Sequence, residues 1–166
     1  MKKKLLLLVT LAVAAIASAY AQPRAIGVRL GYGAEVSYEH SLGQNMLSID
    51  LGVPAFAGVE AVVTYDWIDP FGSTVPWSHK GEWHWYMGVG GGLAWYWGSI
   101  PALGMSVGAA GRFGIEYDFW FPLQLSVDWR PVIGPSIFAY DGNATFGFNT
   151  GGLYAGAICL GVRYKF

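Results

Sequence analysis

The chain has 166 residues, of which 54% are hydrophobic and 13% are charged, and its formal net charge is −1. Globular domains carry about 25% charged residues, and disordered chains combine low hydrophobicity with high charge, so the composition excludes disorder and is unusual for a water-soluble domain. The balanced charge, without a basic stripe, argues against nucleic-acid binding, and the single cysteine, Cys159, excludes an intrachain disulfide.

Residues 1–21 have the pattern of a signal peptide. A basic segment, Lys2 to Lys4, precedes an uncharged apolar core, and Ala19-Tyr20-Ala21 supplies the small-x-small pattern that signal peptidase reads. Cleavage after Ala19 and an uncleaved membrane anchor are the alternatives. Because the apolar core is too short to span a membrane comfortably, we expect cleavage, which leaves residues 22–166 as one domain in the cell envelope.

Two long stretches, residues 83–111 and 142–162, contain no Asp, Glu, Lys or Arg. Hydropathy alone would predict transmembrane helices there. The first stretch, however, holds eight glycines and Pro101, and the second holds six glycines. Glycine destabilises a helix by about 1 kcal/mol per residue relative to alanine, so the composition disfavours helices.

Alternation with a period of two predicts strands instead. From Leu103 to Tyr117 every large apolar residue stands at an odd position, whereas Arg112, Glu116 and Asp118 stand at even positions. The last segment repeats this pattern. The apolar set is large and aromatic, and the opposite set is mostly Gly, Ala and Ser with isolated charges. This pattern is typical of a membrane barrel with lipid outside and a narrow interior.

The fold class predicted is therefore all-β: an eight-stranded antiparallel up-and-down transmembrane β-barrel preceded by a cleaved signal peptide. Closure is expected because lipid offers no partner for an open backbone edge. The predicted strands are residues 24–31, 34–42, 46–55, 58–68, 82–97, 103–118, 123–133 and 152–166.

The number of predicted strands depends on whether residues 31–33 form a turn. If no turn formed there, one long strand would place the same alternate residues from Ile26 to Tyr38 on the outside, and the barrel would have seven strands. A three-residue turn that pairs Leu30 with Ala34 gives eight, and bacterial single-chain barrels have even counts. The longest connection, residues 134–151, is predicted to be an external loop that includes Phe138, Tyr140, Phe146 and Phe148.

The end of the chain reads Leu160-Gly161-Val162-Arg163-Tyr164-Lys165-Phe166. With this ending and the strand pattern, the mature chain resembles the small outer-membrane barrels of the OmpA/OmpX-like eight-stranded class. The resemblance implies that the cell outer membrane is the location. It also implies an assembly signal that barrel assembly machinery reads by strand addition, formed by Leu160, Val162, Tyr164 and Phe166. The sequence departs from OmpA in stopping at Phe166, so we expect no periplasmic domain and do not carry over the anchoring role of that domain.

The inward positions gather charged residues that must pair to be tolerated in a barrel just wide enough for side chains. We expect a mixed-sign network that plugs the lumen. Across the turn at residues 120–122, the predicted register sets Arg112 opposite Arg130. The network is predicted to comprise Arg29, Glu60, Arg112, Glu116, Asp128, Arg130 and Arg163.

Other candidate sites are weaker. Gly88, Gly90 and Gly92 point inward and lack the context of a phosphate loop, so we expect them to make room for side chains from the facing wall. Glu82 and His84, with His79 in the preceding loop, allow a metal site only with loose spacing. His40 and Ser41 are neighbours in a strand and point to opposite faces, so they cannot cooperate directly. The loop pair Ser78-His79 lacks the acid in register that a catalytic triad needs.

The sequence therefore predicts a structural or interaction protein of the outer membrane without catalysis, metal or other cofactor. The expected partners are outer-membrane lipids and lipopolysaccharide, with barrel assembly machinery and periplasmic chaperones during biogenesis. We expect a monomer that binds no nucleic acid. The alternatives are an outer-membrane lipid-modifying enzyme and a small pore.

Overall fold

The computed structural model describes residues 23–69, 80–97, 103–140, 143–150 and 158–166, and the regular elements in these ranges are all strands. None of the described segments forms a helix with the length and apolarity that a membrane span requires. The strands are β1 (Pro23–Leu30), β2 (Gly33–Leu42), β3 (Asn45–Pro54), β4 (Gly58–Ile68), β5 (Gly81–Trp97), β6 (Leu103–Phe119), β7 (Gln124–Trp129), β8 (Val132–Tyr140), β9 (Asn143–Asn149) and β10 (Ile158–Lys165).

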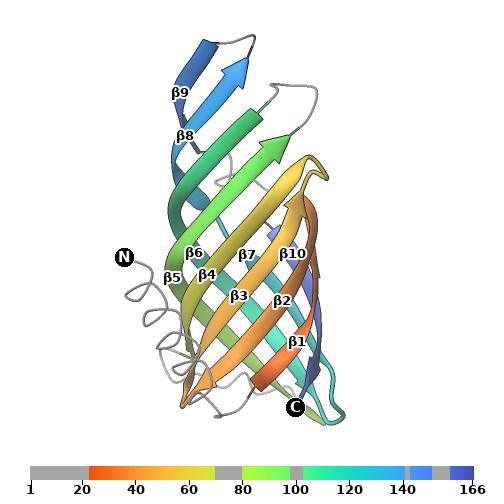
Figure 1. Ribbon diagram of the computed structural model, residues 1–166. Coiled ribbons are helices and arrows are strands. Elements are labelled where there is room, and N and C mark those ends of the chain that lie inside the picture. Colours follow the sequence, from red (N-terminus) through yellow and green to blue (C-terminus); the bar gives the residue numbers. More distant parts are fainter. Residues whose placement is uncertain (1–22, 70–79, 98–102, 141–142, 151–157) are drawn as a thin grey trace, which may run out of the picture.

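The strands form one antiparallel sheet that closes into a barrel (Figure 1). The strands β1 to β5 pair in chain order, β5 pairs with β6, and β6 pairs with β7. The ring closes through β10, which lies between β7 and β1. The predictions of an all-β chain and of an eight-stranded antiparallel up-and-down barrel are therefore confirmed.

The first turn forms as predicted, so the seven-strand alternative is wrong. β1 ends at Leu30 and β2 begins at Gly33, and Leu30 pairs with Ala34. The short turn places the next strand beside the first one, and β2 pairs in turn with β3. The uncharged stretch from residue 83 forms β5 and β6, whose ladder runs from Gly81 opposite Phe119 to Trp97 opposite Leu103.

The seventh predicted strand is too short, and the predicted external loop at residues 134–151 is wrong over most of its length. β7 and β8 keep one register along β6, with Phe113 opposite Trp129 and Ala110 opposite Val132. They are one strand interrupted at Pro131, whose carbonyl accepts a hydrogen bond of 3.0 Å from the amide of Gly111. β9 then pairs with β8 as a hairpin, within the range that was predicted to be an external loop.

The polarity of the barrel is reversed relative to a water-soluble protein. Arginines, carboxylates and hydroxyls dominate the buried positions, whereas large apolar side chains are exposed on the outside.

We name the two ends of the barrel by their residues. The hairpin end is the one where Tyr140 and Asn143 lie, and the terminal end is the one where Pro23 and Phe166 lie (Figure 1).

The inward glycines of β5 lie very close to the neighbouring strand β4. A Cβ atom at Gly90 would lie 1.9 Å from the carbonyl oxygen of Val63 on the neighbouring strand β4, and one at Gly88 would lie 1.9 Å from Oδ1 of Asp66 on the same strand. A Cβ at Gly92 would meet Val62, again on β4, at 2.9 Å. These glycines therefore permit close approach of β4 and β5, and the room that they leave for the facing wall stays a prediction.

Candidate functional site

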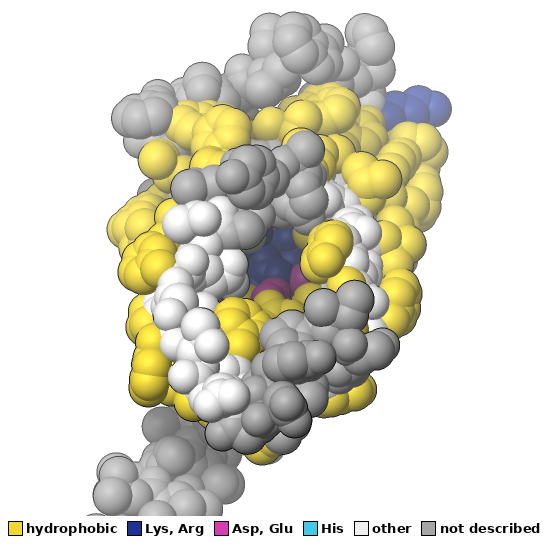
Figure 2. Space-filling model, turned by 90° about the horizontal axis from the view of Figure 1, so that it is seen from above, with side chains coloured by type: hydrophobic (Ala, Val, Ile, Leu, Met, Phe, Trp, Pro, Cys, Tyr) yellow, Lys and Arg dark blue, Asp and Glu magenta, His cyan; other side chains and the backbone are white. Residues whose placement is uncertain are grey.

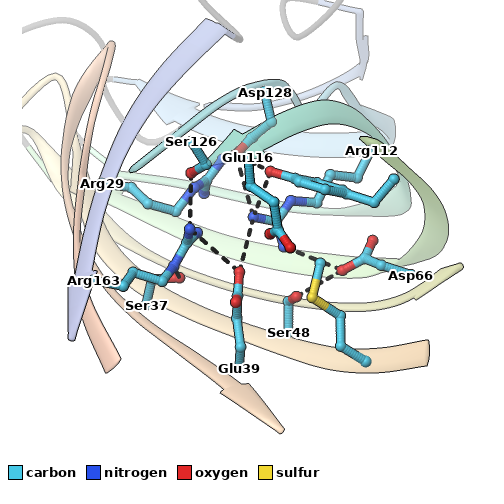
Figure 3. Close-up of polar contacts among 12 residues, drawn as sticks. Arg29, Ser37, Glu39, Ser48, Asp66, Arg112, Glu116, Ser126, Asp128 and Arg163 are labelled. Carbon is cyan, nitrogen blue, oxygen red and sulfur yellow. Dashed lines mark hydrogen bonds and ion pairs between the residues drawn. The ribbon is translucent and has the colours of Figure 1, made fainter. Parts of the chain in front are cut away.

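The lumen of the barrel holds a network of ion pairs that links most of its strands. Figure 3 shows arginines and carboxylates from different strands pointing toward one another across the interior. All seven predicted network residues lie on this inward side, and they come from β1, β4, β6, β7, β10 and the interruption between β7 and β8. Side chains of alternating strand positions point to one face, which is why the period of two places these charges together.

Arg29 of β1 connects three other strands. Its guanidinium pairs with Glu35 of β2, with Asp50 of β3 at 3.0 Å, and with Asp128 of β7. The Arg29 side chain is completely buried. Burial of a guanidinium is tolerated when several carboxylates compensate its lost hydration, as these three do.

Arg112 of β6 occupies the middle of the lumen. It pairs with Asp66 of β4 at 3.1 Å and with Asp128 at 3.2 Å, and all three side chains are fully buried. Its guanidinium also stands over the ring of Tyr86, 4.9 Å from the centroid. Ser48 and Thr64 donate hydrogen bonds of 2.6 and 3.0 Å to Asp66. Asp128 therefore joins Arg29 and Arg112, and it connects two halves of the network.

Arg163 of β10 and Arg130, between β7 and β8, are the other two arginines of the predicted network. Arg163 pairs with Glu39 at 3.2 Å and donates hydrogen bonds to Ser37 of 3.0 Å and to Ser126 of 2.8 Å. Arg130 pairs with Glu35 at 2.6 Å and with Glu60 at 2.9 Å.

Glu116, the last predicted member, pairs with Arg24, a residue that sequence reasoning missed. Arg24 also pairs with Glu39 at 3.0 Å. By strict alternation with Ile26 it should point outward, but the register of β1 against β2 shifts between Pro23 and Ala25. Such a bulge turns one extra side chain to the same face, and here it adds a cation to the lumen.

The network does not fill the barrel evenly. Inward positions toward the hairpin end combine small residues with two rings: Tyr96 pairs with Gly58 and Gly104, Phe138 lies close to Gly104, and Ala94 pairs with Ser106. Seen from above, the barrel is hollowed at its centre, with basic and acidic side chains at the floor of the hollow (Figure 2). The lumen is thus hollow toward the hairpin end and is blocked below the hollow by the charged network.

A second polar pair lies at the terminal end and was also missed. Nδ1 of His84 lies 2.8 Å from Oδ2 of Asp69, and the other oxygen of Asp69 accepts a hydrogen bond of 3.2 Å from the amide of Trp85. Asp69 adopts a positive φ of 45° just beyond β4. Glu82 lies 3.6 Å from Nε2 of His84. His79 and Ser78, which the sequence analysis considered with this region, fall outside the described residues.

The residues predicted as an assembly signal lie on the outer side of β10 and at its end. Leu160, Val162 and Tyr164 are exposed and alternate with the buried Gly161 and Arg163. Phe166 is exposed, its ring meets that of Tyr164 edge-on at 5.4 Å, and its amide donates to the carbonyl of Arg24. Cys159 is buried on the inner side, as a free thiol.

Within the described ranges, no three His, Cys, Asp or Glu side chains form a group that could hold a metal ion. Comparison with protein-family models gives no match, and neither curated proteins nor solved structures show a significant similarity to the chain.

Proposed function

We propose that the chain is an integral protein of the outer membrane, with a structural or interaction role and a lumen plugged by side chains. One observation carries this proposal, namely the reversed polarity of the closed barrel. Charged side chains such as Arg29, Arg112 and Asp128 are buried inside, and large apolar side chains such as Val89 and Leu93 are exposed outside.

The outer surface is suited to lipid. Water-soluble monomers rarely expose contiguous apolar patches of more than a few hundred Å², yet outward positions around the whole ring are apolar here. Val28, Leu51, Val63, Val107 and Leu125 are examples on five different strands. Closure of the ring supports the same placement, because open backbone edges are not tolerated in hydrocarbon.

Aromatic side chains at the terminal end support a membrane interface at that level. They gather at the ends of β4, β5, β6 and β10 and in the turn that follows β6, and several contact one another. The set comprises Trp67, Trp83, Tyr117, Phe119, Trp120, Phe121, Tyr164 and Phe166. Tryptophan and tyrosine rings favour the headgroup layer, where one part of the ring is apolar and the other is hydrated.

The plug favours a structural role over a pore. Arg112, Asp66 and Asp128 have no exposed side-chain surface, and Arg29 and Arg163 are buried at the neighbouring levels. An ion that crossed the barrel would have to displace these paired charges. We therefore propose a closed lumen, and stable conductance steps from pure protein in planar bilayers would contradict this part of the proposal.

An outer-membrane lipid-modifying enzyme is the second reading, and the Asp69–His84 pair is the feature that favours it. A carboxylate on one imidazole nitrogen is the arrangement that orients a catalytic histidine. The contact of the other nitrogen, however, is with Glu82, and within the described residues no serine or cysteine is bonded to His84. We therefore propose that the Asp69–His84 pair holds the ends of β4 and β5 together.

The proposed partners follow from the proposed location. Outer-membrane lipids and lipopolysaccharide would contact the apolar exterior, and barrel assembly machinery would read the strand that ends at Phe166, after export directed by residues 1–21. Fractionation of cells that express the full chain tests the location. We expect the protein in the outer-membrane fraction, resistant to extraction by urea, and recovery in the soluble periplasmic fraction would contradict the proposal.

A further inference from the structure

The hairpin of β8 and β9 extends the barrel wall beyond the rim on one side. Figure 1 shows β8 and β9 as the highest elements, above the ends of β1 to β4. β8 pairs with the part of β6 nearest the hairpin end, from Ala110 opposite Val132 to Leu103 opposite Ala139. β9 pairs with β8 alone in the described sheet order, from Gly134 opposite Asn149 to Tyr140 opposite Asn143.

The two faces of this hairpin differ in polarity. On the outer face, Ile137 stands opposite Phe146 and Pro135 stands opposite Phe148. Phe146 and Phe148 are 76% and 65% exposed, which makes them among the most exposed apolar side chains of the described residues. The other face carries Ser136, Gly147 and Thr145, and also Phe138, which stands opposite Thr145 and whose ring lies close to Gly104 of β6. Because strand residues alternate between faces, the outer side of the hairpin is apolar, whereas the other side combines polar and small residues with Phe138.

The aromatic side continues the outer surface of the barrel without a break. One row of paired residues runs from Val59 on β4 through Trp95, Met105 and Ile137 to Phe146 on β9. Every member of that row is exposed and apolar. The apolar surface that we assign to lipid therefore continues onto the outer face of the hairpin.

The hairpin also lacks the charged residues that a segment surrounded by water normally carries. β8 and β9 contain no charged residue. Edge strands that face water are normally protected by charged side chains, lysine above all, and a two-stranded extension is only marginally stable without a surface that covers its apolar face.

We propose that the outer face of the β8–β9 hairpin lies against the lipid of the leaflet at the hairpin end, at the boundary between acyl chains and headgroups. Phe146 and Phe148 insert among the lipids, and Thr145 faces water. The boundary layer suits β9 because water and headgroups there supply hydrogen-bond partners for an edge strand, which the hydrocarbon core cannot do. This inference rests on the proposed function, because it requires the barrel to span a membrane.

The test uses nitroxide labels at single cysteines in the full chain, in a Cys159→Ser background. Phe146→Cys reports the outer face of the hairpin, Thr145→Cys is the adjacent control on the other face, and Val127→Cys reports the middle of the barrel wall. Each labelled protein is reconstituted in vesicles of phosphatidylethanolamine and phosphatidylglycerol and checked for the folded state by electrophoresis without heating. Collision with oxygen reports lipid, and collision with a water-soluble nickel chelate reports water.

We expect the ratio of oxygen to nickel collisions to be several-fold higher at position 146 than at position 145, with position 127 also in lipid. If position 127 is in lipid while positions 145 and 146 contact nickel equally, this inference is overturned and the proposed function stands. If position 127 contacts nickel as well, the proposed function itself fails. Spin–spin broadening at position 146 that disappears on dilution with unlabelled protein would show a second copy on this face and would also overturn the inference.

Discussion

The guanidinium of Arg29 donates a hydrogen bond to the carboxylate of Asp128, although their strands, β1 and β7, are not neighbours in the ring. β10 lies between them, so the contact reaches past a strand and exists only in the closed barrel. Asp128 also pairs with Arg112, 3.2 Å away, and accepts a hydrogen bond of 3.1 Å from Tyr86. One carboxylate therefore pairs with two buried guanidinium groups.

Replacement of this carboxylate should destabilise the barrel strongly. Asp128→Ala leaves Arg29 and Arg112 with one fewer counter-charge each, and removal of one partner from a buried ion pair costs roughly 3–5 kcal/mol. The free energy of unfolding by urea, in detergent or lipid, measures the loss. Asp118→Ala is the matched control, because Asp118 belongs to the same sheet face but is partly exposed at the terminal end. Equal losses in the two variants would contradict the central position of Asp128.

Two adjacent glycines of β5 should differ in their tolerance of alanine. A Cβ at Gly90 would lie 1.9 Å from the carbonyl oxygen of Val63, a backbone atom that cannot move without β4. The nearest atom to a Cβ at Gly91 is 3.5 Å away. Gly90→Ala should therefore lower the free energy of unfolding by about 1–3 kcal/mol through overpacking, whereas Gly91→Ala should change it little. Equal tolerance of both substitutions would show that β4 and β5 are not packed as described.

The Asp69–His84 contact should stabilise the terminal end of the β4–β5 pair. Asp69→Ala removes the acceptor for His84 and for the amide of Trp85, and alanine is also unfavourable at the positive φ of this position. We expect a loss of about 1–3 kcal/mol in the free energy of unfolding. Asp69→Asn keeps an acceptor oxygen and tolerates the left-handed conformation, so it should retain most of the stability. A large loss in Asp69→Asn alone would contradict this explanation.

The aromatic residue at the end of the chain should affect assembly in cells more than stability. If Phe166 belongs to the strand that assembly machinery reads, Phe166→Ala should reduce the amount of protein in the outer membrane several-fold. Refolding of the purified variant into detergent should be unchanged. Trp120→Ala is a suitable control, since Trp120 is similarly exposed at the same end. Equal yields of the two variants in cells would count against the assembly signal.

The sequence predicted the barrel because its strongest signal is local. A period of two can be read from any ten residues, and it assigns each residue to the lumen or to the outside without knowledge of the neighbours. For the same reason it predicted Arg112 opposite Arg130, since the short turn between β6 and β7 sets the register.

The features that the sequence missed depend on interruptions of that period or on distant contacts. Arg24 enters the lumen because a bulge shifts the register of β1, and no local pattern marks the bulge. The sequence predicted a loop from residue 134 onward, yet β6 and β9 hold β8 in the sheet on either side. Asp69 meets His84 because β4 and β5 pair, although 15 residues separate the two in the chain.

The central claim is that the chain forms a closed barrel in lipid, and its electrophoretic migration with and without heating tests this most directly. Protein refolded into detergent or lipid vesicles is loaded in dodecyl sulfate either unheated or boiled, and circular dichroism is recorded on the same sample. We predict a compact, faster band without heating, which converts to a slower band on boiling, together with a β-type spectrum. A single band at one position in both lanes, or an α-type spectrum, would contradict the closed barrel.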